Sequence, residues 1–104
     1  MSADLVNALK ALGNPTRLQI MQWLRDPQAS FAQYEPIADR AEYGVCATHL
    51  AAKTGLAQST ISTYMGVLER AGLVTSSRIG KWTHYRRNAA EVERLLDELG
   101  DTLK

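Results

Sequence analysis

The chain has 104 residues, of which 45% are hydrophobic and 22% are charged. This length corresponds to about one domain, and the composition is that of an ordinary globular protein rather than a disordered one. It contains no run of about 18 apolar residues, so no segment is predicted to span a membrane. The start of the sequence, Met1 to Asp4, has no basic region and does not resemble a secretory signal, so we expect a cytoplasmic protein.

The single cysteine, Cys46, excludes a disulfide within the chain and a zinc site built from four cysteines. The net charge of +1 hides an uneven distribution. Residues 56–87 carry five bases and one acid, whereas residues 88–104 carry five acids and two bases. The basic segment is where an anionic partner would bind, although taken alone this excess is equally consistent with a solvated surface.

The first part of the chain predicts two consecutive helices. Residues 4–12 carry apolar residues at helical spacing, and Gly13 ends this helix. Asn14 is a suitable N-cap and Pro15 a suitable first residue for a second helix, which we expect to end near Arg25. The apolar residues of the first helix are Leu5, Leu9 and Leu12. Those that the second helix is expected to bury are Leu18, Ile20, Met21, Trp23 and Leu24.

Residues 26–44 are the least regular part of the sequence. Pro27 and Pro36 exclude a long helix, and we expect a structured loop with one short helical turn. Four apolar residues give this loop something to bury: Phe31, Tyr34, Ile37 and Tyr43. The loop could cap the core between the flanking helices, which we favour, or it could form a pocket for an effector.

Two further helices joined by a tight turn are predicted next. The third covers residues 46–54 and ends at Gly55, a favourable residue for the left-handed position after a helix. The fourth covers residues 58–71 and ends at Gly72. Its buried face is expected to consist of Ile61, Met65 and Leu68. Its other face carries short or hydroxyl-bearing side chains near its start: Ser59, Thr60, Ser62, Thr63 and Tyr64.

The last part of the chain predicts a hairpin and a helix. Two β-prone segments, residues 73–79 and 81–87, flank a glycine turn. Asn88 and Glu91 then have the spacing of a capping box, which opens the last helix. The apolar face of this helix consists of Val92, Leu95, Leu96 and Leu99.

A helix, a short turn, a second helix and a hairpin in this order predict a winged helix-turn-helix. We therefore expect residues 1–104 to form one mainly helical domain, with a β-hairpin wing, that binds double-stranded DNA. The second helix of such a motif enters the major groove, so we expect base contacts from Thr60, Thr63 and Tyr64. Hydroxyl and cationic side chains bind phosphate oxygens. The candidates for phosphate contacts are Ser59, Ser62, Arg78, Lys81 and Arg86.

Four segments together resemble one protein family. They are ALGNPTRLQIM from Ala11, GLAQSTIS from Gly55, LERAGLV from Leu68 and GKWTHYR from Gly80. This combination resembles the ArsR/SmtB family of bacterial winged-helix repressors. The resemblance implies a homodimer built on the first and last helices, which binds a palindromic operator and releases it when an inducer, such as a small molecule, arrives. It also implies that the family's recognition-helix contacts fall on Gln58, Ser59, Thr60, Ser62, Thr63 and Tyr64.

Three features depart from the family pattern. Ala57 stands where the family often has a serine N-cap, and Gly66 stands where it often has a base. A weaker helix cap and one phosphate contact fewer are therefore expected. Residues 44–48 lack the Cys-x-Cys-Asp pattern of metal-sensing members, and the last helix has no histidine. We therefore predict neither of the family's metal sites and no cofactor.

Alternatives remain open for three side chains and for the partner. Cys46 and His49 could share a helix face in a thiol- or metal-responsive repressor, but we favour a small core residue and an ordinary partner. For His84 we favour a satisfied surface or dimer residue over a ligand. Another alternative is a winged-helix interaction module that binds protein and not DNA. The sequence has no arrangement typical of an active site, so an enzyme is not predicted.

Overall fold

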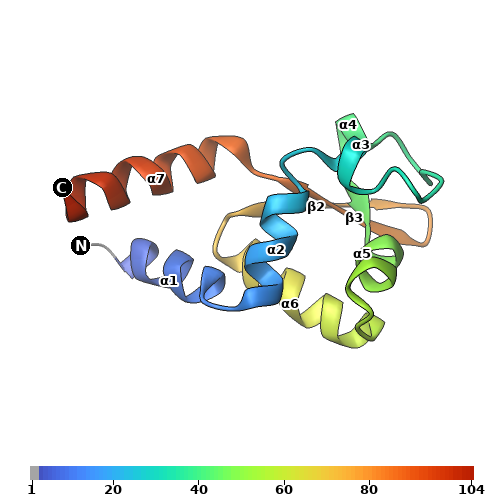
Figure 1. The fold of residues 1–104 in the computed structure, drawn as a ribbon, viewed down its shortest axis with the longest axis horizontal. Coiled ribbons are helices and arrows are strands. Elements are labelled where there is room, and N and C mark those ends of the chain that lie inside the picture. Colours follow the sequence, from blue (N-terminus) through green and yellow to red (C-terminus); the bar gives the residue numbers. More distant parts are fainter. Residues whose placement is uncertain (1–2) are drawn as a thin grey trace.

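The computed structural model describes residues 3–104, so Met1 and Ser2 lie outside the described residues (Figure 1). In chain order the elements are α1 (Ala3–Leu12), α2 (Pro15–Trp23), α3 (Pro27–Ser30), α4 (Arg40–Tyr43), β1 (Val45–Cys46), α5 (Ala47–Thr54), α6 (Gln58–Arg70), β2 (Val74–Ile79), β3 (Trp82–Arg87) and α7 (Ala89–Leu103). The predicted winged helix-turn-helix is confirmed. Its helix pair is α5 and α6, and the β2–β3 hairpin is called the wing below.

Capping residues set the starts of α2 and α7. The Asn14 side chain accepts hydrogen bonds from the backbone N–H groups of Thr16 and Arg17, at 2.9 and 3.0 Å. The Asn88 side chain accepts one from the Glu91 N–H at 3.4 Å. Both side chains satisfy N–H groups that the first turn of a helix leaves without partners. The two predicted N-caps are therefore confirmed, although α2 ends at Trp23, slightly before the predicted position.

The segment between α2 and β1 caps the core. It contains two short helical turns, α3 and α4, instead of the single turn predicted. Phe31 is completely buried and meets Trp23 of α2 edge to face, with ring centroids 5.9 Å apart. Tyr34 stacks on His49 of α5 at 5.1 Å. These ring contacts tie the segment to both flanking helices, as favoured above. Ile37 is an exception, because it lies on the exposed side.

The sheet contains one strand that the sequence analysis missed. The strand order of the sheet is β1-β3-β2, and both strand pairs are antiparallel. Cys46 was expected to begin a helix, but its backbone is extended and pairs with His84 on β3, so α5 begins at Ala47. Gly44 makes this pairing possible. Its φ of +84° is unfavourable for other residues, and a Cβ there would collide with the carbonyl oxygen of Tyr85.

The core lies where α1, α2, α5 and α6 meet the sheet. As predicted, Ile61, Met65 and Leu68 on one face of α6 are completely buried. Two apolar residues that were expected to be buried, Leu18 and Leu96, are each 55% exposed. They lie on faces of α2 and α7 that no other part of residues 3–104 covers fully, and both line a groove between these helices.

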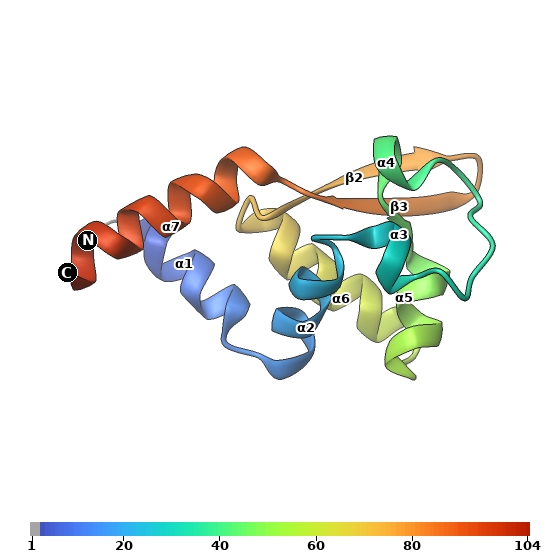
Figure 2. The same cartoon turned by 45° about the horizontal axis from the view of Figure 1, so that its top comes forward.

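The two ends of the molecule differ in structure (Figure 2). At one end α1 and α7 lie side by side and carry both chain termini. At the other end lie α5, the short helices α3 and α4, and the tip of the wing. Helix α6 runs between these ends and contacts α1, α2, α5 and β2. Each helix within residues 3–104 is too short or too polar to span a membrane.

Candidate nucleic-acid interface

The turn between α5 and α6 has the geometry of a helix-turn-helix. Helix α5 ends at Gly55, whose φ of +74° places it in the left-handed region, and its N–H bonds to the Ala51 carbonyl at 2.9 Å. Helix α6 begins after Ala57, which makes no side-chain cap bond within the described chain. The absence of this cap agrees with the expectation for Ala57. It leaves N–H groups of the first turn to water or to an anion.

One face of α6 points away from the protein. A helix turns by about 100° per residue, so residues spaced by three or four share a face. The outward face consists of Ser59, Ser62, Thr63, Gly66 and Arg70, opposite the three completely buried residues of the core face. Four of these five residues are exposed, and Gly66 is half-buried. Three of the predicted contacts, Ser59, Ser62 and Thr63, therefore lie where a partner of α6 would bind.

Two predicted base contacts, Thr60 and Tyr64, lie on a flank of α6 and are half-buried. The Arg17 guanidinium of α2 lies over the Tyr64 ring, 5.2 Å from its centroid. This cation–π contact holds the ring against α2. Tyr64 and Thr60 are therefore at the edge of the outward face of α6 and not at its centre.

The start of α6 and the wing line a common concave surface, called the wing groove below. Its volume is about 460 Å³. It brings together four predicted contacts from two elements, Gln58, Ser59, Ser62 and Lys81. The other side chains that line it, which the sequence analysis did not predict as contacts, are Cys46, Ala47, Thr48, Trp82, Thr83 and Tyr85. The alternation of side chains along a strand could have indicated Thr83 and Tyr85, which share one face of β3.

One polar contact joins the wing to α6, and two others lie within the tip of the wing. The Ser76 hydroxyl of β2 donates a hydrogen bond to the Glu69 carboxylate of α6 at 2.5 Å. At the tip, the Arg78 Nε donates to the Gly80 carbonyl at 3.3 Å, and the Lys81 ammonium lies 4.9 Å from the centre of the Trp82 ring. Both cations are exposed, so they are accessible to an anionic partner.

Arg86 is the predicted contact that the fold places apart from the others. It lies near the end of β3, roughly 13 Å along the strand from Trp82 at the tip. Its Nη1 donates a hydrogen bond to the Glu42 carbonyl of α4 at 2.8 Å. Arg86 therefore joins the wing to the segment before β1, and it does not line the wing groove.

A buried polar cluster lies where β1, β3 and α5 meet. Cys46 is buried, as favoured above, and its sulfur lies 3.0 Å from the Thr48 hydroxyl. His84 was expected to be a satisfied surface or dimer residue, but it is 1% exposed inside the protomer, and neither ring nitrogen has a hydrogen-bond partner among residues 3–104. Burial lowers the pKa of His49, and the nearby charges of Arg40 and His84 lower it further. No group of three or more potential metal ligands occurs within the described residues.

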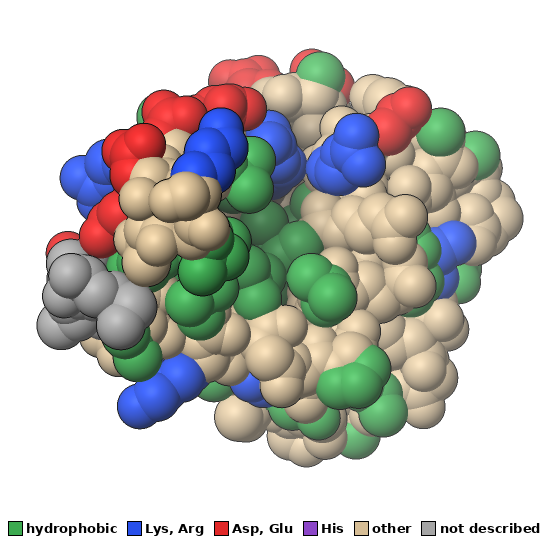
Figure 3. Space-filling model, turned by 60° about the vertical axis from the view of Figure 1, so that its left-hand side comes forward, with side chains coloured by type: hydrophobic (Ala, Val, Ile, Leu, Met, Phe, Trp, Pro, Cys, Tyr) green, Lys and Arg blue, Asp and Glu red, His purple; other side chains and the backbone are tan. Residues whose placement is uncertain are grey.

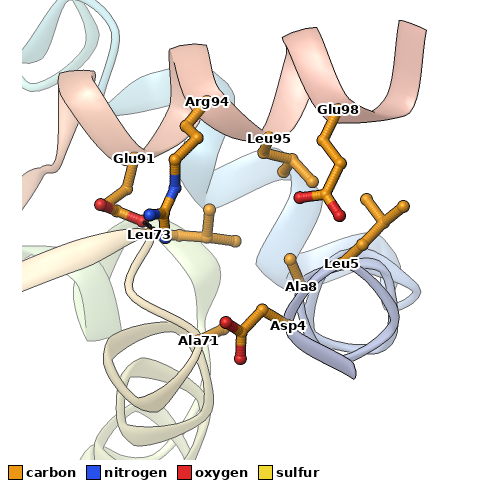
Figure 4. A pocket seen from close by; sticks show the side chains of 9 residues that line it. All are labelled: Asp4, Leu5, Ala8, Ala71, Leu73, Glu91, Arg94, Leu95 and Glu98. Carbon is orange, nitrogen blue, oxygen red and sulfur yellow. Dashed lines mark hydrogen bonds and ion pairs between the residues drawn. The ribbon is translucent and has the colours of Figure 1, made fainter. Parts of the chain in front are cut away.

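The end of the molecule formed by α1 and α7 presents an apolar surface. Figure 3 shows hydrophobic side chains in a hollow at this end, with acidic side chains along one edge. In the close view of Figure 4, the buried side chains of Leu5, Ala8 and Leu95 pack between α1 and α7, with the carboxylates of Asp4 and Glu98 beside them. The exposed apolar side chains of these two helices are Leu9, Leu96 and Leu103. An exposed apolar surface with a charged edge is typical of a protein–protein contact.

The chain is similar to known bacterial regulatory proteins. A profile of the family described as bacterial regulatory protein, arsR family, matches residues 42–76, which contain β1, α5, α6 and the start of β2. The uncharacterized HTH-type transcriptional regulator YbzH of Bacillus subtilis is 44% identical over 94 residues, which cover 90% of this chain and 93% of the relative. The putative arsenical resistance operon repressor ArsR2 of Halobacterium salinarum is 33% identical over 101 residues, which cover 97% of this chain and 71% of the relative.

A solved structure has the same fold. It is the homodimeric winged helix-turn-helix DNA-binding domain of a possible ArsR-family transcriptional regulator from Mycobacterium bovis, with a TM-score of 0.63 and 27% sequence identity. The match covers 95% of this chain and 77% of that one. Since close relatives match along nearly its whole length, the chain belongs to the arsR family of bacterial regulatory proteins, which are DNA-binding transcriptional regulators and not enzymes.

Proposed function

We propose that the protein is a homodimeric transcriptional repressor that binds a palindromic operator through α6 and the wing. The observation that carries this proposal is the wing groove, in which Gln58, Ser59 and Ser62 of α6 lie beside Lys81 of the wing. An α-helix fits the major groove, and a hairpin beside it reaches the flanking backbone. The helix would select the sequence, while the wing would contribute affinity.

The geometry supports distinct roles for the candidate contacts. Thr63 lies on the outward face of α6, so it has the strongest case for a base contact. Gln58 at the start of the helix can pair with base edges, and Thr60 and Tyr64 would reach only the edge of the groove. Phosphate contacts are proposed for Ser59, Ser62, Arg78, Lys81 and Arg86. Within this set Arg86 has the weakest case, because its guanidinium already binds the Glu42 carbonyl.

The apolar surface of α1 and α7 supports the homodimer. The similar solved structure is described as homodimeric. A dimer with twofold symmetry places its two recognition helices in equivalent positions, and this arrangement matches a palindromic DNA sequence. Residues 1–104 would then combine DNA binding and dimerisation in a single cytoplasmic domain. Occupation of an operator at a promoter would block transcription until an inducer lowers the affinity for DNA.

A gel-shift assay against the DNA directly upstream of the protein's own coding sequence tests this function. We expect Thr63→Ala to weaken specific binding and Lys81→Ala to weaken binding to all sequences. The matched control is Lys104→Gln, which removes an exposed cation just after α7 that lines neither the wing groove nor the groove between α2 and α7. Binding that is unaffected by either change at the interface contradicts the proposal. Size-exclusion chromatography with and without a chelator tests the dimer and its independence of metal.

A further inference from the structure

A second groove lies on the flank of α6 opposite the wing, and its charge is strongly positive. It has a volume of about 410 Å³ and is called the basic groove below. Its lining residues are Asn7, Lys10, Ala11, Arg17, Val67, Arg70 and Ala71. Three of these side chains are cationic, and none of the described residues that line the groove is acidic. Two of the cations, Lys10 and Arg17, come from outside the basic segment at 56–87.

Arg70 is folded back along α6 over the position of Gly66. A Cβ added to Gly66 would lie 3.2 Å from Nη1 of Arg70. The guanidinium is therefore displaced by about one helical turn, roughly 5 Å, towards the start of the helix. It lies on the same outward face as Ser59 and Thr63. The absence of a side chain at Gly66 leaves the space that the Arg70 guanidinium occupies.

Arg70 is available to an external anion. On its other side it borders a groove that also contains Asp4 and Glu91. The ion pair found in the described chain, however, joins Glu91 to Arg94 at 2.7 Å. Arg70 itself is exposed.

Arg17 is held in place at the base of the same groove. Its Nε donates a hydrogen bond to the Ala11 carbonyl at 2.6 Å, and its Nη2 donates to the Lys10 carbonyl at 3.4 Å. These two bonds use two of the five N–H donors of a guanidinium. The end of α1 therefore fixes the orientation of Arg17, and the remaining donors can serve a ligand.

We propose that Lys10, Arg17 and Arg70 bind phosphates of the DNA strand on the side of the major groove opposite the wing. This inference rests on the proposed function. The major groove is about 12 Å wide and a helix with its side chains is about 10–12 Å across, so a bound α6 has a sugar–phosphate backbone on each side. The wing serves one backbone, and the basic groove serves the other. The Arg70 guanidinium, which lies over Gly66, is the cation of this groove on the outward face of α6.

The dependence of DNA affinity on salt tests the inference, because each phosphate contact that is lost reduces the slope of log K against log salt by about 0.9. The probe is a duplex selected from a random-sequence pool by the wild-type protein. We expect Arg70→Gln and Lys10→Gln each to reduce the magnitude of this slope by about 0.9, the value for one phosphate contact, and to lower the affinity severalfold. Lys104→Gln, the matched control, should leave the slope unchanged. Thermal unfolding verifies that each exposed substitution leaves the fold intact.

A charge-transfer experiment sharpens the test. The double variant Gly66→Lys with Arg70→Gln restores a cation to the outward face of α6 from the neighbouring turn, and it should recover the wild-type slope. If the wild-type protein selects a duplex but Arg70→Gln and Lys10→Gln keep its full slope, the basic groove does not contact DNA and the inference is wrong. If the wild-type protein selects no duplex, the proposed function itself is wrong.

Discussion

Cys46 and His84 face each other across the β1–β3 ladder, and both side chains are almost completely buried. His49 lies close enough for its charge to interact with that of His84, and Arg40, also buried, approaches from α4. Arg40 Nη2 donates a hydrogen bond to the Tyr34 carbonyl at 2.6 Å. The second strand of the wing is thus joined to the body of the protein across a polar and titratable cluster.

The first prediction concerns the pH dependence of stability. The folded protein lowers the pKa of His49, first through burial and then through Arg40 and His84. The unfolded chain therefore binds a proton more readily, and the free energy of unfolding falls as the pH decreases through the ordinary histidine value of about 6.5. The contribution is fully present above that pH and is lost as the pH approaches the lowered pKa.

The substitution His49→Phe isolates this effect. A phenylalanine keeps a ring against Tyr34, which stacks on His49, but it cannot be protonated. The free energy of unfolding, measured by urea denaturation at several pH values between about 5 and 7.5, should change less with pH in the variant than in the wild type. An equal change with pH in the two proteins would mean that another group causes the pH dependence.

The second prediction concerns the unsatisfied ring of His84. Burial of a polar group without a hydrogen bond is unfavourable, so its replacement by an apolar residue removes this cost. We expect His84→Leu to change the free energy of unfolding by less than about 1 kcal/mol, or to raise it. Leu68→Ala, at an equally buried apolar position, should lower it by about 2–5 kcal/mol. A loss of similar size in His84→Leu would show that the imidazole makes a stabilising bond.

The third prediction compares two glycines with positive φ. Gly44 and Gly55 have φ values of +84° and +74°, but only at Gly44 would a Cβ collide with backbone, at the Tyr85 carbonyl. Gly55→Ala should cost about 1–2 kcal/mol from backbone strain. Gly44→Ala should cost more than about 4 kcal/mol and separate β1 from β3. Chemical denaturation measures both, and equal losses would contradict the close approach.

The sequence predicted best what local periodicity determines. The face of α6 that carries Ile61, Met65 and Leu68 follows from helical spacing, and the N-cap of α2 follows from Asn14 and Pro15. Strand β1 could not be predicted, because two residues have no periodicity and become a strand only through pairing with β3. The burial of His84 follows from the same pairing.

Some residues of the candidate DNA interface were likewise indicated by the sequence, whereas others are brought together only by the fold. The residues on α6 and at the wing tip lie in continuous motifs, so the sequence indicated them. Lys10 and Arg17 belong to the junction of α1 and α2, and they reach α6 only because the fold packs this junction against it. Likewise, Gly66 indicated a lost phosphate contact, whereas the structure has the Arg70 guanidinium over that position.

The fourth prediction concerns the dimer. Leu96 of α7 is 55% exposed and lines the groove with Leu18 of α2. If a second copy covers this surface, Leu96→Glu removes about 0.8–1.5 kcal/mol of apolar burial from each protomer, since roughly half of the side chain is left to bury, and it adds a charge. The dimer dissociation constant should then rise by at least about tenfold. Sedimentation at micromolar concentration should detect monomers, which bind a palindromic duplex weakly. Ile37→Glu, at an exposed apolar residue outside α1 and α7, is the matched control. A Leu96→Glu protein that remains dimeric would place the contact between protomers elsewhere.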